Sequence, residues 1–209
     1  MRVLSQNVCC QLKDKNSFVS YLGGLPEWDV CHITEVTAKT SKSVEEWIGD
    51  VGLAHRFEAF VHCATRGRVQ VVLVRSSFLP FMTKSKWIGR SGIFEFDLGE
   101  DDCFSLVVTH GPTTEAGRPK FLADMDRLLR SRHKKGRRLV VGDHNVNLDA
   151  DIDSRQLRVA AEYKGFWEAK GLHCQVPFSC TGVPPPALEI ESFPGFPLPL
   201  CRVSLIARI

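Results

Sequence analysis

The sequence has few of the features that would place it outside the ordinary globular proteins. No apolar run approaches the roughly 18 residues that a membrane span needs, and Met1–Cys10 lacks the long apolar segment of a signal peptide. The net charge is only +3, which permits a nucleic-acid partner without arguing for one. We therefore expect an intracellular protein, nuclear or cytoplasmic, with no membrane span.

Zinc-binding cysteine patterns are also missing. The eight cysteines form no CxxC pair, and no run of Cys and His has the spacing of a zinc site. Several cysteines lie within apolar stretches, where a thiol packs as a small hydrophobic group. Free, reduced thiols are the state expected in an intracellular protein.

No internal repeat divides the 209 residues, whose apolar fraction of 44% is typical of one globular domain. Seven of the eleven prolines follow Val176, and proline removes hydrogen-bond donors from both helices and sheets. We therefore assign residues 1–175 to the folded domain and 176–209 to an irregular, Pro-rich tail. Within the tail, only Leu200–Ile209 could form a strand.

The first 170 residues read as short apolar strands with interposed helices. Ser43, with Glu46 three positions later, has the pattern of a capping box and predicts a helix start there. Apolar residues at helical spacing predict a helix over Pro119–Arg132, and Arg155–Lys170 is a further expected helix. The alternation around Glu95 predicts a strand with one wet face. The other expected strands are Val3–Val8, Asp29–Val36, His55–His62, Val69–Ser76, Cys103–Thr109 and Leu139–Val141.

Polar side chains follow four of these strands, at positions where packing does not require them. They are Asn7, Glu35, His110, and the pair Asp143 and Asn145. Strand ends are where α/β folds place their sites. Carboxylate and amide oxygens form a hard donor set suited to Mg²⁺ or Mn²⁺.

The same four segments resemble the motifs of one enzyme superfamily. Val3-Leu-Ser-Gln-Asn7 and Asp29-Val-Cys-His-Ile-Thr-Glu35 are similar to the first two strands of the endonuclease/exonuclease/phosphatase superfamily. Val107-Val-Thr-His110-Gly-Pro112 is similar to its strand with a Tyr or His before a Pro, and Val140-Val-Gly-Asp143-His-Asn145 contains its Gly-Asp-x-Asn signature. The order over about residues 2–150 is that of retrotransposon-type or AP-endonuclease-like domains.

This resemblance implies an α/β fold of the α+β type, a two-layer β-sandwich of mixed sheets flanked by helices, here with incomplete C-terminal strands. It also implies a Mg²⁺ or Mn²⁺ cofactor held by Glu35 and Asn7, and DNA or another nucleic acid as the partner. Asp143 would orient or deprotonate the attacking water, and Asn145 would donate a hydrogen bond to the phosphate. His110 would be a second acid or a phosphate contact.

The family's closing Ser-Asp-His motif is not in the sequence, whose last His is His173 and whose last Asp is Asp153. Ser204 stands where the preceding strand of the family carries an Asp. We therefore expect a chain cut short before its last catalytic element, and activity lowered by several orders of magnitude. Two alternatives remain open: an inactive remnant that binds metal or nucleic acid, and a phosphatase acting on inositol or sphingolipid phosphoesters.

Other polar residues have simpler interpretations. His144 occupies a position that the family gives to a packing residue. The basic residues between Arg127 and Arg138 are typical of a solvated helix end favoured by the helix dipole. Arg66, Arg68 and Arg90 flank strands of the expected site and are weaker candidates for phosphate contact.

Overall fold

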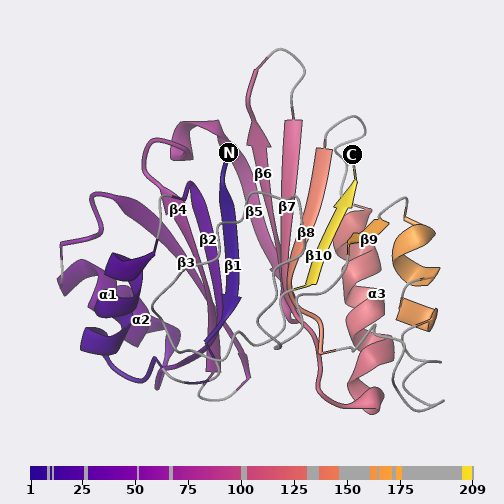
Figure 1. The fold of residues 1–209 in the computed structure, drawn as a ribbon, viewed down its shortest axis with the longest axis horizontal. Helices are drawn as coiled ribbons and strands as arrows, with labels where there is room; N and C mark the ends of the chain where they lie inside the picture. The colour runs from indigo at the N-terminus through magenta and orange to yellow at the C-terminus, as the bar shows by residue number, and fades with distance from the viewer. Residues whose placement is uncertain are drawn as a thin grey trace. The chain divides into compact units, whose positions relative to one another are not determined.

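The computed structural model describes residues 1–8, 10, 12–25, 28–50, 52–65, 68–99, 103–130, 137–145, 161–163, 165–170, 173–175 and 204–208. These residues form two mixed β-sheets with helices, an α+β fold (Figure 1). Met1–Phe81 belong to one compact unit, and Met82 begins a second unit that also contains Ser204–Arg208. Within the ranges given above, every helix is too short or too polar to span a bilayer.

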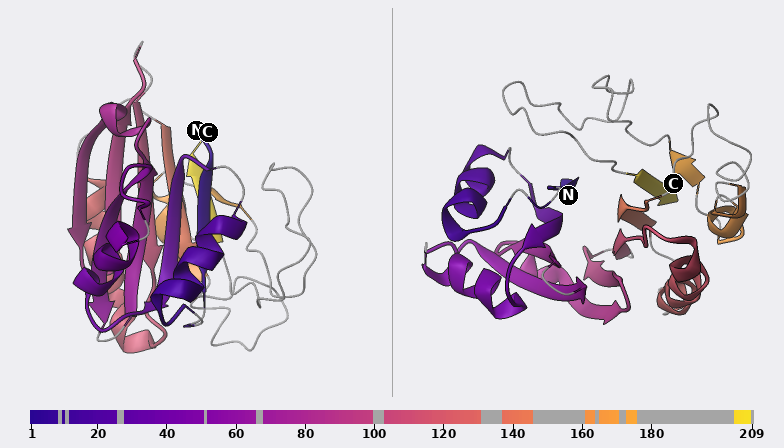
Figure 2. Two further views of the ribbon diagram at one scale, coloured as in Figure 1. Left: turned by 90° about the vertical axis from the view of Figure 1, so that its left-hand side faces the viewer. Right: turned by 90° about the horizontal axis from the view of Figure 1, so that it is seen from below.

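The first unit contains a four-stranded sheet in the order β1-β2-β4-β3. Strands β1 and β2 are parallel, and the other two pairs are antiparallel. Helices α1 and α2 lie on the same side of this sheet (Figure 2). The elements are β1 (Val3–Asn7), α1 (Lys15–Gly24), β2 (Val30–Thr37), α2 (Ser41–Asp50), β3 (Phe57–Thr65), β4 (Arg68–Arg75) and the short helix η1 (Leu79–Phe81).

One face of this sheet is apolar because alternate residues of its strands point toward the two helices. Cys31 and Ile33 of β2 and Leu73 of β4 are fully buried there, together with Phe18 of α1. Burial raises the pKa of the Cys31 thiol, which keeps it protonated and unreactive. The four cysteines whose side chains are described, Cys10, Cys31, Cys63 and Cys103, are free thiols.

The second unit contains a six-stranded sheet in the order β5-β6-β7-β8-β10-β9, in which only β7 and β8 are parallel. Helix α3 packs on this sheet, and its Met125 and Leu128 share a core with Val107 and Val140. The elements are β5 (Met82–Ile88), β6 (Ser91–Asp97), β7 (Cys103–His110), the short helix η2 (Glu115–Gly117), α3 (Arg118–Leu129), β8 (Arg137–Asp143), β9 (His173–Gln175) and β10 (Ser204–Arg208).

The C-terminal strands are the shortest of this sheet, with three residues in β9 and five in β10. Strand β10 lies within the Pro-rich segment, where the sequence allowed a terminal strand, and it pairs antiparallel with β8 from Ser204↔Gly142 to Arg208↔Arg138. The division of the chain at residue 175 remains a prediction. Of the helix expected over Arg155–Lys170, the described stretches 161–163 and 165–168 are helical.

One local prediction was wrong, and a second was wrong in part. Helix α2 begins at Ser41, because Thr40 rather than Ser43 caps it: the Ser43 peptide N–H donates to Thr40 Oγ1 at 3.2 Å. The expected wet face of β6 is exposed at Asp97 but not at Glu95, which is only 3% exposed. Its carboxylate is tolerated there because Lys84 of the edge strand β5 lies 3.6 Å away.

Candidate active site

Asn7 and Glu35, the two expected metal ligands, lie on neighbouring parallel strands of the first unit, Asn7 at the end of β1 and Glu35 two residues before the end of β2. Asn7 is the last residue of β1 and is paired in register with Thr34, the residue before Glu35 on β2. Adjacent strands lie about 4.8 Å apart, and Asn7 and Glu35 lie on adjacent strands one residue out of register. Their joint role as metal ligands remains a prediction.

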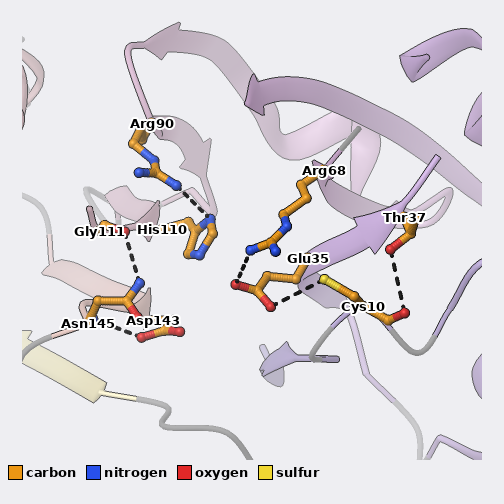
Figure 3. Close-up of polar contacts among 9 residues, drawn as sticks. All are labelled: Cys10, Glu35, Thr37, Arg68, Arg90, His110, Gly111, Asp143 and Asn145. Carbon is orange, nitrogen blue, oxygen red and sulfur yellow. Dashed lines mark hydrogen bonds and ion pairs between the residues drawn. The ribbon is translucent and has the colours of Figure 1, made fainter. Parts of the chain in front are cut away.

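The Glu35 carboxylate is mostly buried and has partners on both oxygens (Figure 3). Arg68 Nη1 lies 3.5 Å from Oε1, and the Cys10 thiol donates to Oε2 at a sulfur–oxygen distance of 3.7 Å. The side chain of Glu35 is 14% exposed and that of Arg68 is 53% exposed. Arg68, which the sequence offered as a phosphate contact, thus supplies the positive charge that a half-enclosed carboxylate requires.

The donor chemistry of this pair fits a hard divalent cation. Both side chains present oxygen, which Mg²⁺ and Mn²⁺ prefer over nitrogen and sulfur, and Glu35 supplies the negative charge. In the part of the chain that the structure describes, no three His, Cys, Asp or Glu residues group closely enough to hold a metal. A cation here would therefore keep several waters, as Mg²⁺ usually does.

His110, Asp143 and Asn145 gather at the carboxyl ends of the parallel strands β7 and β8 in the second unit. His110 and Asp143 are paired in register, and the Gly111 peptide N–H donates to the Asp143 carbonyl at 2.6 Å. Asn145 Nδ2 donates to the Gly111 carbonyl at 2.9 Å. The three predicted catalytic residues of this unit therefore share one strand-end corner (Figure 3).

Backbone geometry fixes the Asp143 and Asn145 side chains in this corner. The Asn145 peptide N–H donates to Asp143 Oδ1 at 2.8 Å. This is an Asx-turn, in which an aspartate side chain is held by the backbone N–H two residues further on. Asn145 has φ +50°, a left-handed conformation that asparagine tolerates better than most residues. Gly142, with φ +141°, provides the bend that precedes them.

Arg90 holds the imidazole of His110. Its guanidinium nitrogen Nη2 lies 3.4 Å from His110 Nδ1, and its carbonyl accepts from the His110 peptide N–H at 3.1 Å. A guanidinium only donates hydrogen bonds, so Nδ1 must be the acceptor and Nε2 must carry the hydrogen. Of the two roles expected for His110, this geometry favours the phosphate contact, with Nε2–H as the donor.

Arg90→Met should therefore relax the tautomer of His110. In the wild type, ¹⁵N NMR above pH 8 is expected to show Nδ1 unprotonated and Nε2 protonated. In Arg90→Met both tautomers should populate, because the donor that requires a lone pair on Nδ1 is lost. Arg75→Met is the matched control, since the Arg75 guanidinium donates instead to the Trp28 carbonyl at 3.0 Å. An unchanged His110 spectrum in Arg90→Met would contradict the assignment.

His144, between the two residues of the signature, packs into the interior of the second unit. It is 2% exposed, its Nδ1 is hydrogen-bonded to the Tyr163 hydroxyl, and it contacts the ring of Trp167 edge-on. This is the packing role that the resemblance implied for the position. His144 is therefore a support for Asp143 and Asn145 rather than a further member of the site.

Two residues of the basic cluster, Arg130 and Arg138, make contacts within the protein. Arg130 Nη2 lies 2.6 Å from Asp126 Oδ2, and Arg138 Nη1 donates to the Leu129 carbonyl at the end of α3, at 3.2 Å. Hydrogen bonds from Lys170 and then Arg130 hold the pKa of Asp126 below its ordinary value. Arg138 is five residues from Asp143 along β8, about 17 Å at 3.3 Å per residue, so Arg138 lies away from the site. Arg132, Lys134 and Lys135 of the cluster lie outside the described residues.

Arg130→Ala combined with Lys134→Ala, the second of which lies outside the described residues, should leave the affinity for DNA within about threefold of the wild type. A residue that neutralises a phosphate contributes about 0.9 to the slope of log affinity against log salt, and we expect that slope to stay unchanged. Fluorescence anisotropy of labelled DNA across a salt series measures both quantities. A large loss of affinity with a flatter slope would show that the helix end is part of the binding face.

Several solved structures of known proteins are similar to this chain over nearly its whole length. A 3' phosphatase, NExo from Neisseria bound to a product DNA hairpin, matches with a TM-score of 0.63 at 12% identity over 100% of this chain and 86% of its own. The endonuclease domain of TRAS1, a telomere-specific non-LTR retrotransposon, matches with 0.57 at 12% identity over 99% and 84%. An endonuclease/exonuclease/phosphatase family protein from Leptotrichia buccalis matches with 0.59 at 11% identity over 100% and 88%.

The chain has the endonuclease/exonuclease/phosphatase fold. This confirms the fold expected from the four motifs. No family model and no curated protein matches the sequence itself. Of the three solved structures named above, one is a 3' phosphatase bound to a product DNA hairpin and one is the endonuclease domain of a retrotransposon.

Sequence reasoning missed the partners that orient the site residues. Arg68 and Arg90 stood out only as basic residues flanking strands, whereas the structure joins them to Glu35 and His110. No sequence signal indicated Thr34, which is paired with Asn7. These contacts depend on strand register, which the motifs by themselves do not encode.

Proposed function

We propose that this chain is a divalent-metal-dependent phosphodiesterase that hydrolyses nucleic-acid phosphodiester bonds. The observation that carries the proposal is the placement of the site residues. Asn7 and Glu35 lie at or near the carboxyl ends of one parallel pair of strands, and His110, Asp143 and Asn145 lie at or just after the carboxyl ends of the other. The fold is shared with a retrotransposon endonuclease domain and with a 3' phosphatase bound to DNA. This similarity supports hydrolysis of a phosphoester in nucleic acid over hydrolysis of another kind of bond.

The chemistry follows from the donors and acceptors present. Glu35 and Asn7 would hold Mg²⁺ or Mn²⁺, which when bound neutralises charge on the phosphate and on the departing oxygen. Asp143 would accept a proton from the attacking water or orient it, since Asn145 N–H already fixes its Oδ1. Asn145 Nδ2 gives one hydrogen to Gly111, and its second can be donated to the phosphate. His110 would donate from Nε2.

A retrotransposon-type endonuclease is the form of this function that we favour. The TRAS1 domain matches over 99% of the chain, and the short opening strand and the Gly-Asp-x-Asn site resemble those that such modules share. The proposal requires Glu35 and Asp143 to act on one phosphodiester bond. It therefore predicts that variants of the two residues have the same phenotype, and that the double variant is no worse than either single one.

The 209-residue chain should be a weak nuclease. A histidine and the aspartate that orients it are among the residues that such enzymes use to contact the phosphate, and the sequence has no Ser-Asp-His. Loss of one member of a catalytic set commonly lowers the rate by about 10³–10⁴-fold. We expect slow nicking of supercoiled DNA that depends on Mg²⁺ or Mn²⁺ and disappears in Asp143→Ala.

The experiment compares wild type and Asp143→Ala on supercoiled plasmid, single-stranded RNA and a lipid phosphoester, each with and without metal. Metal-dependent nicking that Asp143→Ala abolishes supports the proposal. Hydrolysis of the lipid phosphoester alone would overturn the assignment of substrate. Robust turnover on DNA would leave the function standing and contradict the expected weakness. Nicking equally strong in Asp143→Ala would mean that this residue has no part in the reaction.

A further inference from the structure

A β-bulge in β2 decides where the Glu35 side chain points. Ile33 is paired with Val71 of β4 and Val36 is paired with Val69, so two residues of β2 lie opposite the single residue Gln70. Glu35 itself has φ +61°, the left-handed region that costs a residue with a side chain. Bulges of this kind re-aim side chains next to functional sites.

The apolar cluster of the first unit shows which face of the sheet Thr34 and Glu35 occupy. Ile33 and Val36 both belong to the apolar cluster that α1 and α2 cover, so the two residues between them face the opposite side of the sheet. In a regular strand Glu35 would follow Ile33 into that cluster, because side chains alternate. The bulge therefore places Thr34 and Glu35 on one face together.

Asn7 belongs to the same face. Its neighbours on β1, Gln6 and Val8, point toward the helices: Val8 is part of the apolar cluster, and Gln6 is hydrogen-bonded to Tyr21 of α1. Asn7 is the register partner of Thr34 across the parallel pair. One face at the ends of β1 and β2 thus presents three oxygen-bearing side chains, those of Asn7, Thr34 and Glu35.

The Thr34 hydroxyl stands out among the polar groups of this face. Ser5 Oγ is hydrogen-bonded to His32 Nδ1 at 2.9 Å, and His32 Nε2 is hydrogen-bonded to Gln70 Oε1 at 3.2 Å. Thr34 is 1% exposed, and among the described residues its Oγ1 has no hydrogen-bond partner. Buried hydroxyls nearly always have a hydrogen-bond partner. We therefore expect a bound molecule beside Asn7 and Glu35 to supply the partner of the Thr34 hydroxyl.

We propose that Thr34 is a positioning residue for the cation, whose hydroxyl accepts a hydrogen bond from a water that the cation carries. The inference rests on the proposed function, since it takes Glu35 and Asn7 as the direct ligands. Mg²⁺ and Mn²⁺ sites with few protein ligands retain water, and groups that hold such water typically change affinity for the metal by about 10–100-fold. A threonine hydroxyl has both the lone pairs and the position that this requires.

The test is a titration of Mn²⁺ followed by electron paramagnetic resonance, on the whole chain and without nucleic acid. Thr34→Val keeps the shape and removes the hydroxyl, and Thr34→Ser keeps the hydroxyl. We expect Thr34→Val to bind Mn²⁺ about 10–100-fold more weakly and Thr34→Ser to stay within about threefold of the wild type. Melting in EDTA should be equal or higher for Thr34→Val, because the methyl group replaces a hydroxyl without a partner.

Glu35→Gln in the same titration separates a failure of the cation site from a failure of the role proposed for Thr34. If Glu35→Gln loses Mn²⁺ and Thr34→Val binds it as the wild type does, the role of Thr34 is overturned and the cation site stands. The role of Thr34 is likewise overturned if Thr34→Val weakens binding only together with a lower melting temperature in EDTA, which is a structural effect. If the wild type binds no Mn²⁺, or Glu35→Gln binds it normally, the cation site and the inference fall together.

Discussion

Gly142→Ala is expected to destabilise the protein by about 4 kcal/mol or more. Single substitutions reach losses of this size only through a few causes, among them overpacking and backbone strain. A Cβ at this position would lie 1.9 Å from the Thr109 carbonyl oxygen and 2.8 Å from its carbon, both backbone atoms of the neighbouring strand. The residue also has φ +141°, which side chains rarely adopt. For a chain of this length the loss corresponds to a fall in Tm of about 8–16 °C.

Thermal unfolding followed by circular dichroism measures this effect, and Gly165→Ala is the matched control in the same unit. Nothing lies within 4 Å of a Cβ built on Gly165, and alanine favours a helix over glycine by up to about 1 kcal/mol. The control should therefore melt at the wild-type temperature or slightly higher. A Gly142→Ala protein that melts within about 2 °C of the wild type would refute the close approach of β7 and β8 at this corner.

Glu35→Gln is expected to remove the stabilisation of the protein by Mg²⁺. A ligand at 100 times its Kd stabilises the folded state by about 2.7 kcal/mol, which for about 200 residues raises Tm by roughly 5–11 °C. The glutamine keeps the shape of the side chain and loses the negative charge that a hard cation requires. The melting temperature of the variant should therefore be the same in Mg²⁺ and in EDTA.

Glu58→Gln serves as the control for this experiment, because Glu58 is an exposed residue on β3 of the same sheet. It removes the same charge and should leave the Mg²⁺-dependent shift at its wild-type size. Nicking activity should follow the same order, with Glu35→Gln inactive and Glu58→Gln unaffected. A full thermal shift in Glu35→Gln would remove Glu35 from the cation site.

The buried strands could be predicted because their sequences admit few other structures. The run Val69-Gln-Val-Val-Leu-Val is nearly all apolar, and it forms the central strand β4. Strand β5 was not predicted, because Met82–Ile88 contains two lysines, a serine and a threonine and is exposed along most of its length. An edge strand of this kind is held by pairing with β6, and pairing leaves no apolar pattern in the strand itself.

For the site, the sequence indicated which residues matter but not how they are held. Asn7, Glu35, His110, Asp143 and Asn145 could be chosen because polar side chains ended apolar strands. The bulge at Glu35 could not be predicted from the sequence, since a one-residue shift of register is set by packing on both faces of the sheet. The roles proposed for these five residues remain predictions that the variants above test.

The pairing of β8 has a consequence for how the protein folds during synthesis. Strand β8 is paired on one side with β7, which precedes it in sequence by only η2 and α3. On the other side it is paired with β10, roughly 60 residues further along the chain. Closing so long a connection adds little free energy, since each doubling of loop length costs about 0.6 kcal/mol. It does delay pairing, because contacts distant in sequence form slowly. A ribosome that adds about 5–20 residues per second therefore leaves one edge of β8 open for several seconds, a window in which chaperones or a second nascent chain can bind it.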